Sequence, residues 1–296
     1  DIDVAYYYAH DAPLAGGHTA RGFFSRLAKE ISRAIGDTTA DGQVFRVDLR
    51  LRPEGGSGPL VNTVANALMY YEGWGDTWER GVYIKARPVA GDYALGDELI
   101  EGIRPFVFRR HLDYQTIEDF RAMKERIDAE QSVRRMRSGG VRDVKLGAGG
   151  IRELEFVVQI LQLIHGGHDD TVRVRGTMAA LSALERGGMI ASDEAAGLRT
   201  AYEFLRNVEH AVQVVEQRQT QKIPEKAEDL CALARRLGYG VDRRGAAQDA
   251  DEIVAFERDW TRHTTTVRDA FLRFLELRED EAPRAAAVAQ PATDPI

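Results

Sequence analysis

This sequence of 296 residues has a single cysteine, no long apolar run and no excess of basic side chains. The single cysteine, Cys231, excludes a disulfide framework and a multi-cysteine zinc site, and it fits a reducing compartment. No apolar run reaches the roughly 18–20 residues that a membrane-spanning helix needs, and no charged-then-apolar leader opens the sequence. We therefore expect a cytoplasmic protein that makes no membrane contact.

The charge balance is acidic. The sequence has 40 Lys and Arg residues against 47 Asp and Glu residues, which gives a net charge of −7. Proteins that track along nucleic acid carry a basic stripe studded with aromatic residues, and none is evident here, so a polymerase acting on RNA ends is disfavoured and no nucleic-acid partner is expected. Apolar residues make up 44%, enough for one large domain or two ordinary ones with a packed core.

The first sixty residues alternate between strand and helix patterns. Residues 1–8 are rich in strand-forming side chains, and the sequence starts inside this strand with Asp rather than Met, which suggests a partial chain. Apolar residues then recur at helical spacing over residues 19–36. Residues 45–51 alternate between apolar and charged side chains, which predicts a second strand that is buried on one face. The glycines and prolines of residues 53–59 predict a loop.

Helix patterns dominate after residue 62. Gly-rich joints separate several of the apolar stripes, and helices are expected at residues 63–74, 78–87, 97–109, 116–136, 150–165, 177–186, 192–219, 226–237 and 246–278. The pattern predicts an α+β fold: a small sheet domain at residues 1–110 and a helical bundle at residues 111–284. Residues 285–296 contain Pro and Ala without any aromatic side chain, which is typical of a linker.

Three aspartates are candidates for a metal site. Asp1 and Asp3 are two residues apart on one strand and so project from the same face, while Asp48 lies on the polar face of the second strand. If the two strands are neighbours, the three carboxylates converge, and clustered carboxylates favour Mg²⁺ or Mn²⁺. Two such ions stabilise the attacking and leaving oxygens of a phosphoryl displacement. The alternative is that these acids are solvated or cap local turns.

Basic residues beside these acids are candidates for phosphate binding. Arg50 and Arg52 follow Asp48 on the same strand face, where they either bind phosphate or structure the Gly-Pro loop. Lys85 and Arg87 end an apolar helix, where they either contact a nucleotide or complement the helix dipole.

A glycine-rich stretch before the helix at residues 150–165 is the third candidate. Gly149 and Gly150 would offer unpaired amides at the positive end of that helix, a known anion site, although a tight turn is the alternative. Lys145 and Arg152 beside them favour a role in substrate binding. Glu153, in the first turn, is either part of this site or a partner of the helix dipole.

Several motifs in this order resemble the glutamine synthetase adenylyltransferase family. The resemblance covers residues 1–224, and it rests on Phe45–Pro53, Gly56–Val61, Trp78-Glu79-Arg80, Lys85-Ala86-Arg87 and Lys145–Phe156. Members of this family are bifunctional, with two nucleotidyltransferase-type halves joined by a linker. Gly149–Glu153 together with Gln159 and Gln162 is similar to the N-terminal, adenylyl-removing half, which implies that residues 285–296 lead toward a second half.

The resemblance also implies a reaction and its participants. Asp1 and Asp3 match the family's metal pair and Asp48 matches its third acid, which implies two divalent ions, Mg²⁺ or else Mn²⁺. Inorganic phosphate would attack the α-phosphorus of an adenylylated tyrosine on glutamine synthetase and yield ADP. Glutamine synthetase, the PII signal protein, phosphate and ADP or ATP are the implied partners. Two alternatives stay open: the adenylylating half, which would use ATP, and a non-catalytic docking module for glutamine synthetase or PII.

Overall fold

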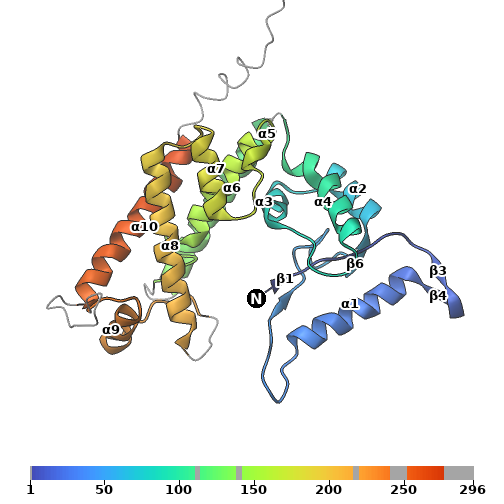
Figure 1. The fold of residues 1–296 in the computed structure, drawn as a ribbon, viewed down its shortest axis with the longest axis horizontal. Coiled ribbons are helices and arrows are strands. Elements are labelled where there is room, and N and C mark those ends of the chain that lie inside the picture. The colour runs from blue at the N-terminus through green and yellow to red at the C-terminus, as the bar shows by residue number, and fades with distance from the viewer. Residues whose placement is uncertain (1, 111–113, 138–141, 216–219, 241–251, 277–296) are drawn as a thin grey trace, which may run out of the picture. The chain divides into compact units, whose positions relative to one another are not determined.

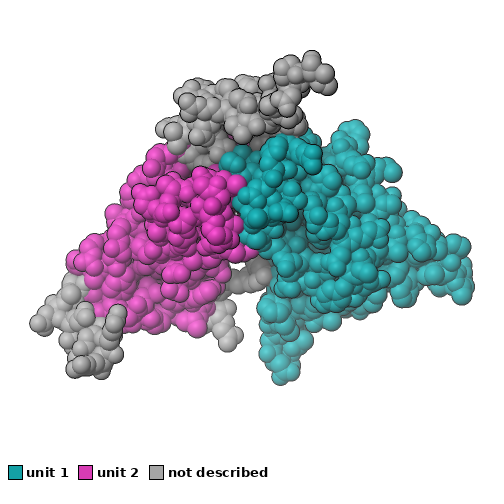
Figure 2. Space-filling view, turned by 45° about the horizontal axis from the view of Figure 1, so that its top comes forward, with its two compact units in different colours: residues 1–116, 163–175 teal, residues 117–162, 176–296 magenta. Residues whose placement is uncertain are grey.

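The chain divides into two compact units (Figure 2). The computed structural model describes all residues except 1, 111–113, 138–141, 216–219, 241–251 and 277–296. Unit 1 contains residues 1–116 and 163–175, and unit 2 contains residues 117–162 and 176–296. The described residues form ten α-helices and three two-stranded sheets, all of whose strands lie in unit 1, so the predicted α+β fold with a small sheet region followed by helices is confirmed.

The helices lie close to where apolar periodicity predicted them (Figure 1). They are α1 (Ala20–Gly36), α2 (Val64–Gly73), α3 (Thr77–Lys85), α4 (Tyr93–Val107), α5 (Tyr114–Arg137), α6 (Ile151–His165), α7 (Thr177–Arg186), α8 (Ser192–Gln213), α9 (Ala227–Arg236) and α10 (Glu252–Glu276). Side-chain caps explain three of the starts: Thr19, Thr63 and Asp92 each accept a hydrogen bond from a backbone amide in the first turn. The cap at Asp92 starts α4 four residues earlier than predicted.

The strands are shorter than predicted. Residues 1–8 contain two strands, β1 (Ile2–Asp3) and β2 (Tyr6–Tyr8), and each pairs in parallel with a different partner, β5 (Val47–Asp48) or β6 (Val61–Thr63). The strand predicted over residues 45–51 is reduced to β5. A turn explains this, because the side chain of Asp48 accepts a hydrogen bond from the amide of Arg50 at 2.9 Å and so diverts the backbone from the ladder.

The antiparallel pair β3 (Pro13–Leu14) and β4 (His18–Thr19) was not predicted. A short 3₁₀ turn, Ala15–Gly17, joins the two strands, and Gly16 and Gly17 both have positive φ values in it. This hairpin leads directly into α1.

Three consecutive tyrosines show how unit 1 packs. In β2 they alternate between faces: Tyr8 stacks on Phe24 of α1 and Tyr6 hydrogen-bonds Ser32 of α1, whereas Tyr7 hydrogen-bonds Tyr83 of α3. The β2–β6 ribbon therefore has α1 on one face and α3 on the other, in agreement with Figure 1. All three rings are thus engaged in contacts within unit 1.

Unit 2 is built from helices whose apolar stripes meet in one core. α10 packs against α8 and α9, and α7 packs against α8. Its core includes fully buried large side chains from five helices, α6 to α10, among them Leu154, Leu198, Leu205, Phe256 and Phe271. None of the described helices combines the length and the apolar character needed to span a bilayer.

Candidate functional site

Two of the three predicted acids lie on neighbouring strands. In the parallel β1–β5 pair, Asp3 is the register partner of Asp48. The amide of Ile2 donates to the carbonyl of Arg46 and the amide of Val4 donates to the carbonyl of Asp48, each at 2.9 Å. Residues in register on parallel strands project from the same face of the ribbon, so these two carboxylates share a face. Asp1 lies outside the described residues.

Arg50 is the main partner of Asp48. Its Nη2 donates to Asp48 Oδ2 at 2.5 Å and its Nε lies 3.0 Å from both carboxylate oxygens. The side chain of Asp48 is 16% exposed and that of Arg50 is 80% exposed. The hydrogen bonds from the Arg50 side chain and amide lower the pKa of Asp48 to about 2. Asp48 is therefore a carboxylate, not a carboxylic acid, at neutral pH.

The donor chemistry of this pair suits a hard divalent cation. Asp3 and Asp48 offer only oxygen ligands, which Mg²⁺ and Mn²⁺ prefer, and Asp3 is exposed. Because most of Arg50 is in solvent, its guanidinium has room to release Asp48. The described residues contain no group of three His, Cys, Asp or Glu side chains placed to hold a metal, and the third predicted ligand, Asp1, is not among them.

Arg52 structures the Gly-Pro loop. Its guanidinium donates to four backbone carbonyls, those of Leu49, Gly56, Gly58 and Pro59. Of the two roles expected for Arg52, these contacts confirm the structuring of the Gly-Pro loop, and phosphate binding stays a prediction. Both Arg50 and Arg52 are thus tied to the turn that follows β5.

The basic pair at the end of α3 lies in the same unit. Lys85 is the last residue of α3, where a positive charge complements the helix dipole, and it is half-buried. Arg87 is exposed two residues later. Their predicted contacts with a nucleotide stay predictions.

The glycine-rich stretch in unit 2 differs from the expectation. Its amides were expected to be unpaired, but Gly147 N donates to Asp143 O, Gly149 N donates to Glu153 Oε2 at 2.9 Å and Gly150 N donates to Gly147 O. The amides of Ile151 and Arg152, at the start of α6, donate to the carbonyls of Val144 and Lys145. These backbone amides are therefore hydrogen-bonded within the chain, because the chain turns back and supplies an acceptor for each of them.

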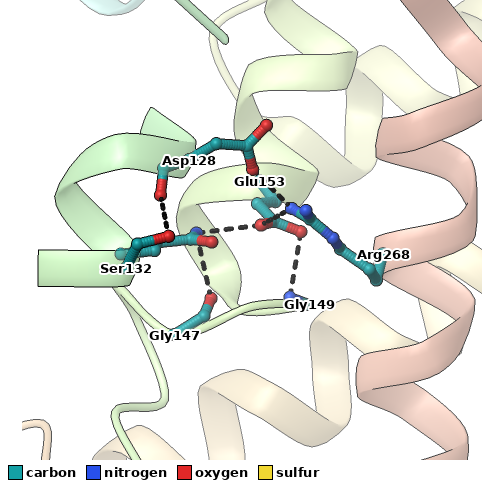
Figure 3. A network of polar contacts seen from close by, with 7 residues as sticks. Asp128, Ser132, Gly147, Gly149, Glu153 and Arg268 are labelled. Atoms are coloured by element: carbon teal, nitrogen blue, oxygen red, sulfur yellow. Dashed lines mark hydrogen bonds and ion pairs between the residues drawn. The ribbon is translucent and has the colours of Figure 1, made fainter. Parts of the chain in front are cut away.

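Glu153 occupies the place that an external anion was expected to take. Its side chain is fully buried, and besides Gly149 it accepts hydrogen bonds from Gln131 Nε2 at 2.8 Å and from Arg268 Nη1 at 2.6 Å (Figure 3). Arg268 also donates to Asp128 Oδ1 at 2.9 Å. An internal carboxylate thus lies at the positive end of α6.

The other predicted side chains of this stretch lie nearer the surface. Arg152 is paired with Glu130 at 2.8 Å, and the side chains are 37% and 55% exposed. Lys145 is half-buried, and its amide donates to Asp143 Oδ1 at 3.0 Å. Their substrate contacts stay predictions.

Sequence patterns could not reveal the partners of Glu153. Gln131 lies on α5 and Arg268 on α10, 22 and 115 residues away from Glu153. No spacing rule links such positions. The only available signal was the composition of Glu153's own motif, in which a carboxylate follows three glycines.

Comparison with protein families separates the chain into two matches. Residues 1–101 match the family model described as Glutamate-ammonia ligase adenylyltransferase. Residues 121–275 match the model described as GlnD PII-uridylyltransferase. The helical region is thus similar to that of a second kind of nucleotidyltransferase.

Individual related proteins match a span that is longer than either of these two regions. The bifunctional glutamine synthetase adenylyltransferase/adenylyl-removing enzymes of Hahella chejuensis and Pseudomonas syringae pv. tomato are 43% and 45% identical over 242 residues, 81% of the chain. The enzyme of the same name from Xanthobacter autotrophicus is 46% identical over 286 residues, 96% of the chain. The chain covers 25%, 24% and 27% of these three relatives, about a quarter of their length. It belongs to the family of bifunctional glutamine synthetase adenylyltransferases/adenylyl-removing enzymes.

Proposed function

We propose that this chain carries the adenylyl-removing activity of its family and releases AMP from a tyrosine of glutamine synthetase by phosphorolysis. The observation that supports this most directly is the register of β1 and β5, which sets Asp3 beside Asp48 on one face. The names of the relatives support the substrate. The similarity of Gly149–Glu153, Gln159 and Gln162 to the N-terminal half of the family supports deadenylylation over adenylylation.

The proposed reaction exchanges one phosphorus–oxygen bond for another. A phosphate oxygen bonds to the α-phosphorus of the adenylylated tyrosine while the bond from that phosphorus to the tyrosyl oxygen breaks. The phenolate takes a proton from water, and ADP leaves. Because phosphate is already anionic near pH 7, no general base is needed to activate it.

The residues of unit 1 have defined tasks in this proposal. Asp3, Asp48 and Asp1 would hold Mg²⁺, which when bound supplies positive charge to the phosphoryl oxygens. Arg50, being exposed, would turn from Asp48 toward the incoming phosphate. Lys85 and Arg87 would bind the nucleotide phosphates. The PII protein is a proposed regulatory partner.

The products of the reaction separate the two halves of the family. Full-length protein with Mg²⁺ and adenylylated glutamine synthetase is expected to form ADP only when phosphate is added. The adenylylating alternative would instead consume ATP with unmodified glutamine synthetase and release pyrophosphate. A docking module would bind glutamine synthetase and form neither product.

Replacing Asp48 tests the acid pair itself. Asp48→Asn in the full-length protein is expected to slow ADP release about 100-fold or more, as removal of a group that stabilises transition-state charge does. Asp37→Asn is the matched control, because Asp37 is an exposed aspartate of the same unit, paired only with Arg33 in the described structure. It is expected to leave the rate unchanged. Deadenylylation at the original rate in Asp48→Asn would exclude a catalytic role for this acid.

A further inference from the structure

A largely buried chain of hydroxyl groups crosses unit 1 between β2 and α3. The hydroxyls of Tyr7 and Tyr83 lie 2.7 Å apart, and the hydroxyl of Tyr71 lies 3.0 Å from that of Tyr83 and 3.3 Å from Glu79 Oε1. Glu79 belongs to the Trp78-Glu79-Arg80 motif and is 4% exposed. We call Tyr7, Tyr71, Glu79 and Tyr83 the tyrosine relay.

The carboxylate at one end of the relay is fixed by the start of α3. Glu79 Oε2 accepts a hydrogen bond from the amide of Asp76 at 2.9 Å, which completes a capping box for this helix. The same oxygen accepts a hydrogen bond from Tyr70 at 3.1 Å. Glu79 is therefore held in place independently of the relay's other end.

Packing alone does not require hydroxyl groups at these positions. The rings of Tyr71 and Tyr83 meet edge to face with centroids 4.9 Å apart, a contact that phenylalanine makes equally well. Burial raises the pKa of both Tyr71 and Tyr83, which keeps the hydroxyls protonated. A buried hydroxyl is unfavourable unless it is hydrogen-bonded, so the relay favours one spacing between the elements that carry it.

Both ends of the relay lie close in sequence to predicted site residues. Tyr7 is four residues after Asp3, and β2 follows β1 directly along the chain. Tyr83 is two residues before Lys85, at the end of α3. The Tyr7–Tyr83 hydrogen bond joins the segment carrying Asp3 to the helix carrying Lys85.

We propose that Tyr83 is a positioning residue, whose hydrogen bond to Tyr7 sets the spacing between the acidic strand and the basic end of α3. This inference rests on the proposed function, because it assumes that both ends contact the reacting groups. Tyr83 itself touches neither metal nor substrate in this scheme. Its effect on the reaction passes through Asp3 and Lys85.

The test is Tyr83→Phe in the full-length protein, assayed by ADP release from adenylylated glutamine synthetase. Phenylalanine keeps the ring contact and removes the hydrogen bonds of the Tyr83 hydroxyl to Tyr7 and Tyr71. Because misplaced reacting groups slow chemistry rather than docking, kcat is expected to fall about tenfold while KM for glutamine synthetase stays within about twofold. The matched control is Tyr70→Phe, which removes the hydrogen bond from the Tyr70 hydroxyl to Glu79 and leaves the Tyr7–Tyr83 bond in place. Its kcat is expected to match that of the wild type.

Tyr7→Phe removes the same hydrogen bond from the other side. Tyr83→Phe also loses the hydrogen bond to Tyr71, but the inference assigns the loss of kcat to the Tyr7–Tyr83 bond, which all three variants lack. Tyr7→Phe is therefore expected to reproduce the kcat of Tyr83→Phe, and the double variant is expected to be no slower than either single one. An unchanged kcat in Tyr83→Phe, equal losses in Tyr83→Phe and Tyr70→Phe, or additive losses in the double variant would overturn the inference.

Hydrogen exchange separates this inference from the proposed function. Amides of residues 2–8 and 83–87 are expected to exchange faster in Tyr83→Phe than in Tyr70→Phe, whether or not the protein releases ADP. If the wild type releases no ADP, the proposed function fails, and faster exchange still shows that Tyr83 holds the two segments together. If the wild type is active and exchange at residues 2–8 is unchanged, only the positioning role fails.

Discussion

Two polar motifs of this chain, one in each unit, carry similar residues but use them differently. In the acid pair of unit 1, Asp3 is exposed, and Asp48 is paired with Arg50, most of whose side chain lies in solvent. The glycine-rich stretch in unit 2 pairs its amides within the chain and buries Glu153 completely. The first motif has oxygen atoms that a ligand can reach, whereas the second holds helices together.

The difference shows what a motif alone leaves open. Glycines before a helix start suit an external anion and an internal carboxylate equally well. What decides between them here is a residue 115 positions away, Arg268, which balances the charge of Glu153 inside the bundle. Unit 1 therefore has an accessible acid pair and unit 2 a closed network, and substitutions in each are expected to differ in size.

Gly149→Ala is expected to have the largest effect on stability. Gly149 has a φ of +70°, and an added Cβ would collide with the carbonyl oxygen of Thr264 on α10. Left-handed strain and overpacking together are expected to lower the free energy of unfolding by about 4 kcal/mol or more, measured by urea denaturation. The control is Gly197→Ala in α8, where the new Cβ would make an ordinary contact, so stability is expected to be unchanged or to rise. Equal stability of both variants would contradict the close packing of this stretch.

Breaking the buried ion pair of Glu153 and Arg268 is expected to lower the free energy of unfolding less than Gly149→Ala does, but more than breaking an exposed ion pair. Glu153→Gln removes the buried partner of Arg268, which keeps its hydrogen bond to Asp128, and is expected to destabilise the protein by about 2 kcal/mol. Glu130→Gln makes the same chemical change in the exposed pair with Arg152 and is expected to cost at most about 1 kcal/mol. Thermal or urea unfolding measures both variants. A smaller loss in Glu153→Gln than in Glu130→Gln would mean that the closed network does not stabilise the bundle.

The smallest effect concerns the acidity of Asp48. Arg50 holds the pKa of Asp48 at about 2, so the stability that this pair adds is present above the ordinary aspartate pKa and is lost as the pH falls through about 2. In Arg50→Met the pKa of Asp48 is expected to rise toward the ordinary value, as followed by NMR titration of its carboxyl carbon. Arg46→Met removes a positive charge that affects Asp48 less than Arg50 does, and it is expected to raise the pKa of Asp48 less. The opposite order would show that Arg50 is not the main partner of Asp48.

Local patterns predicted most of the helices well because apolar periodicity and end signals lie within a few residues of each helix. Thr19 lies at the predicted start of α1 and its side chain caps the helix, and α7 has the predicted bounds Thr177–Arg186. The strands were less predictable, since their lengths depend on partners. Residues 1–8 became two strands because β5 and β6 are separate partners, and neither β6 nor the β3–β4 hairpin was anticipated.

The site was predictable in part for the same reason. Strand alternation placed Asp3 and Asp48 on polar faces, and the structure adds that their strands are in register. The role of Arg52 required knowledge of where the carbonyls of residues 56–59 lie. The partners of Glu153 and the tyrosine relay both join distant segments, and a single sequence carries no periodic signal for such contacts.

The parallel pairing of β1 with β5 has a consequence for the order in which the protein folds. Parallel strands need a long crossover, and here α1 lies between the two strands in the chain. Their ladder is short, so a large loop must close before few hydrogen bonds form. We expect Asp3 and Asp48 to meet late in folding and to part early during gentle denaturation, so that the proposed activity is lost while the helices are still intact.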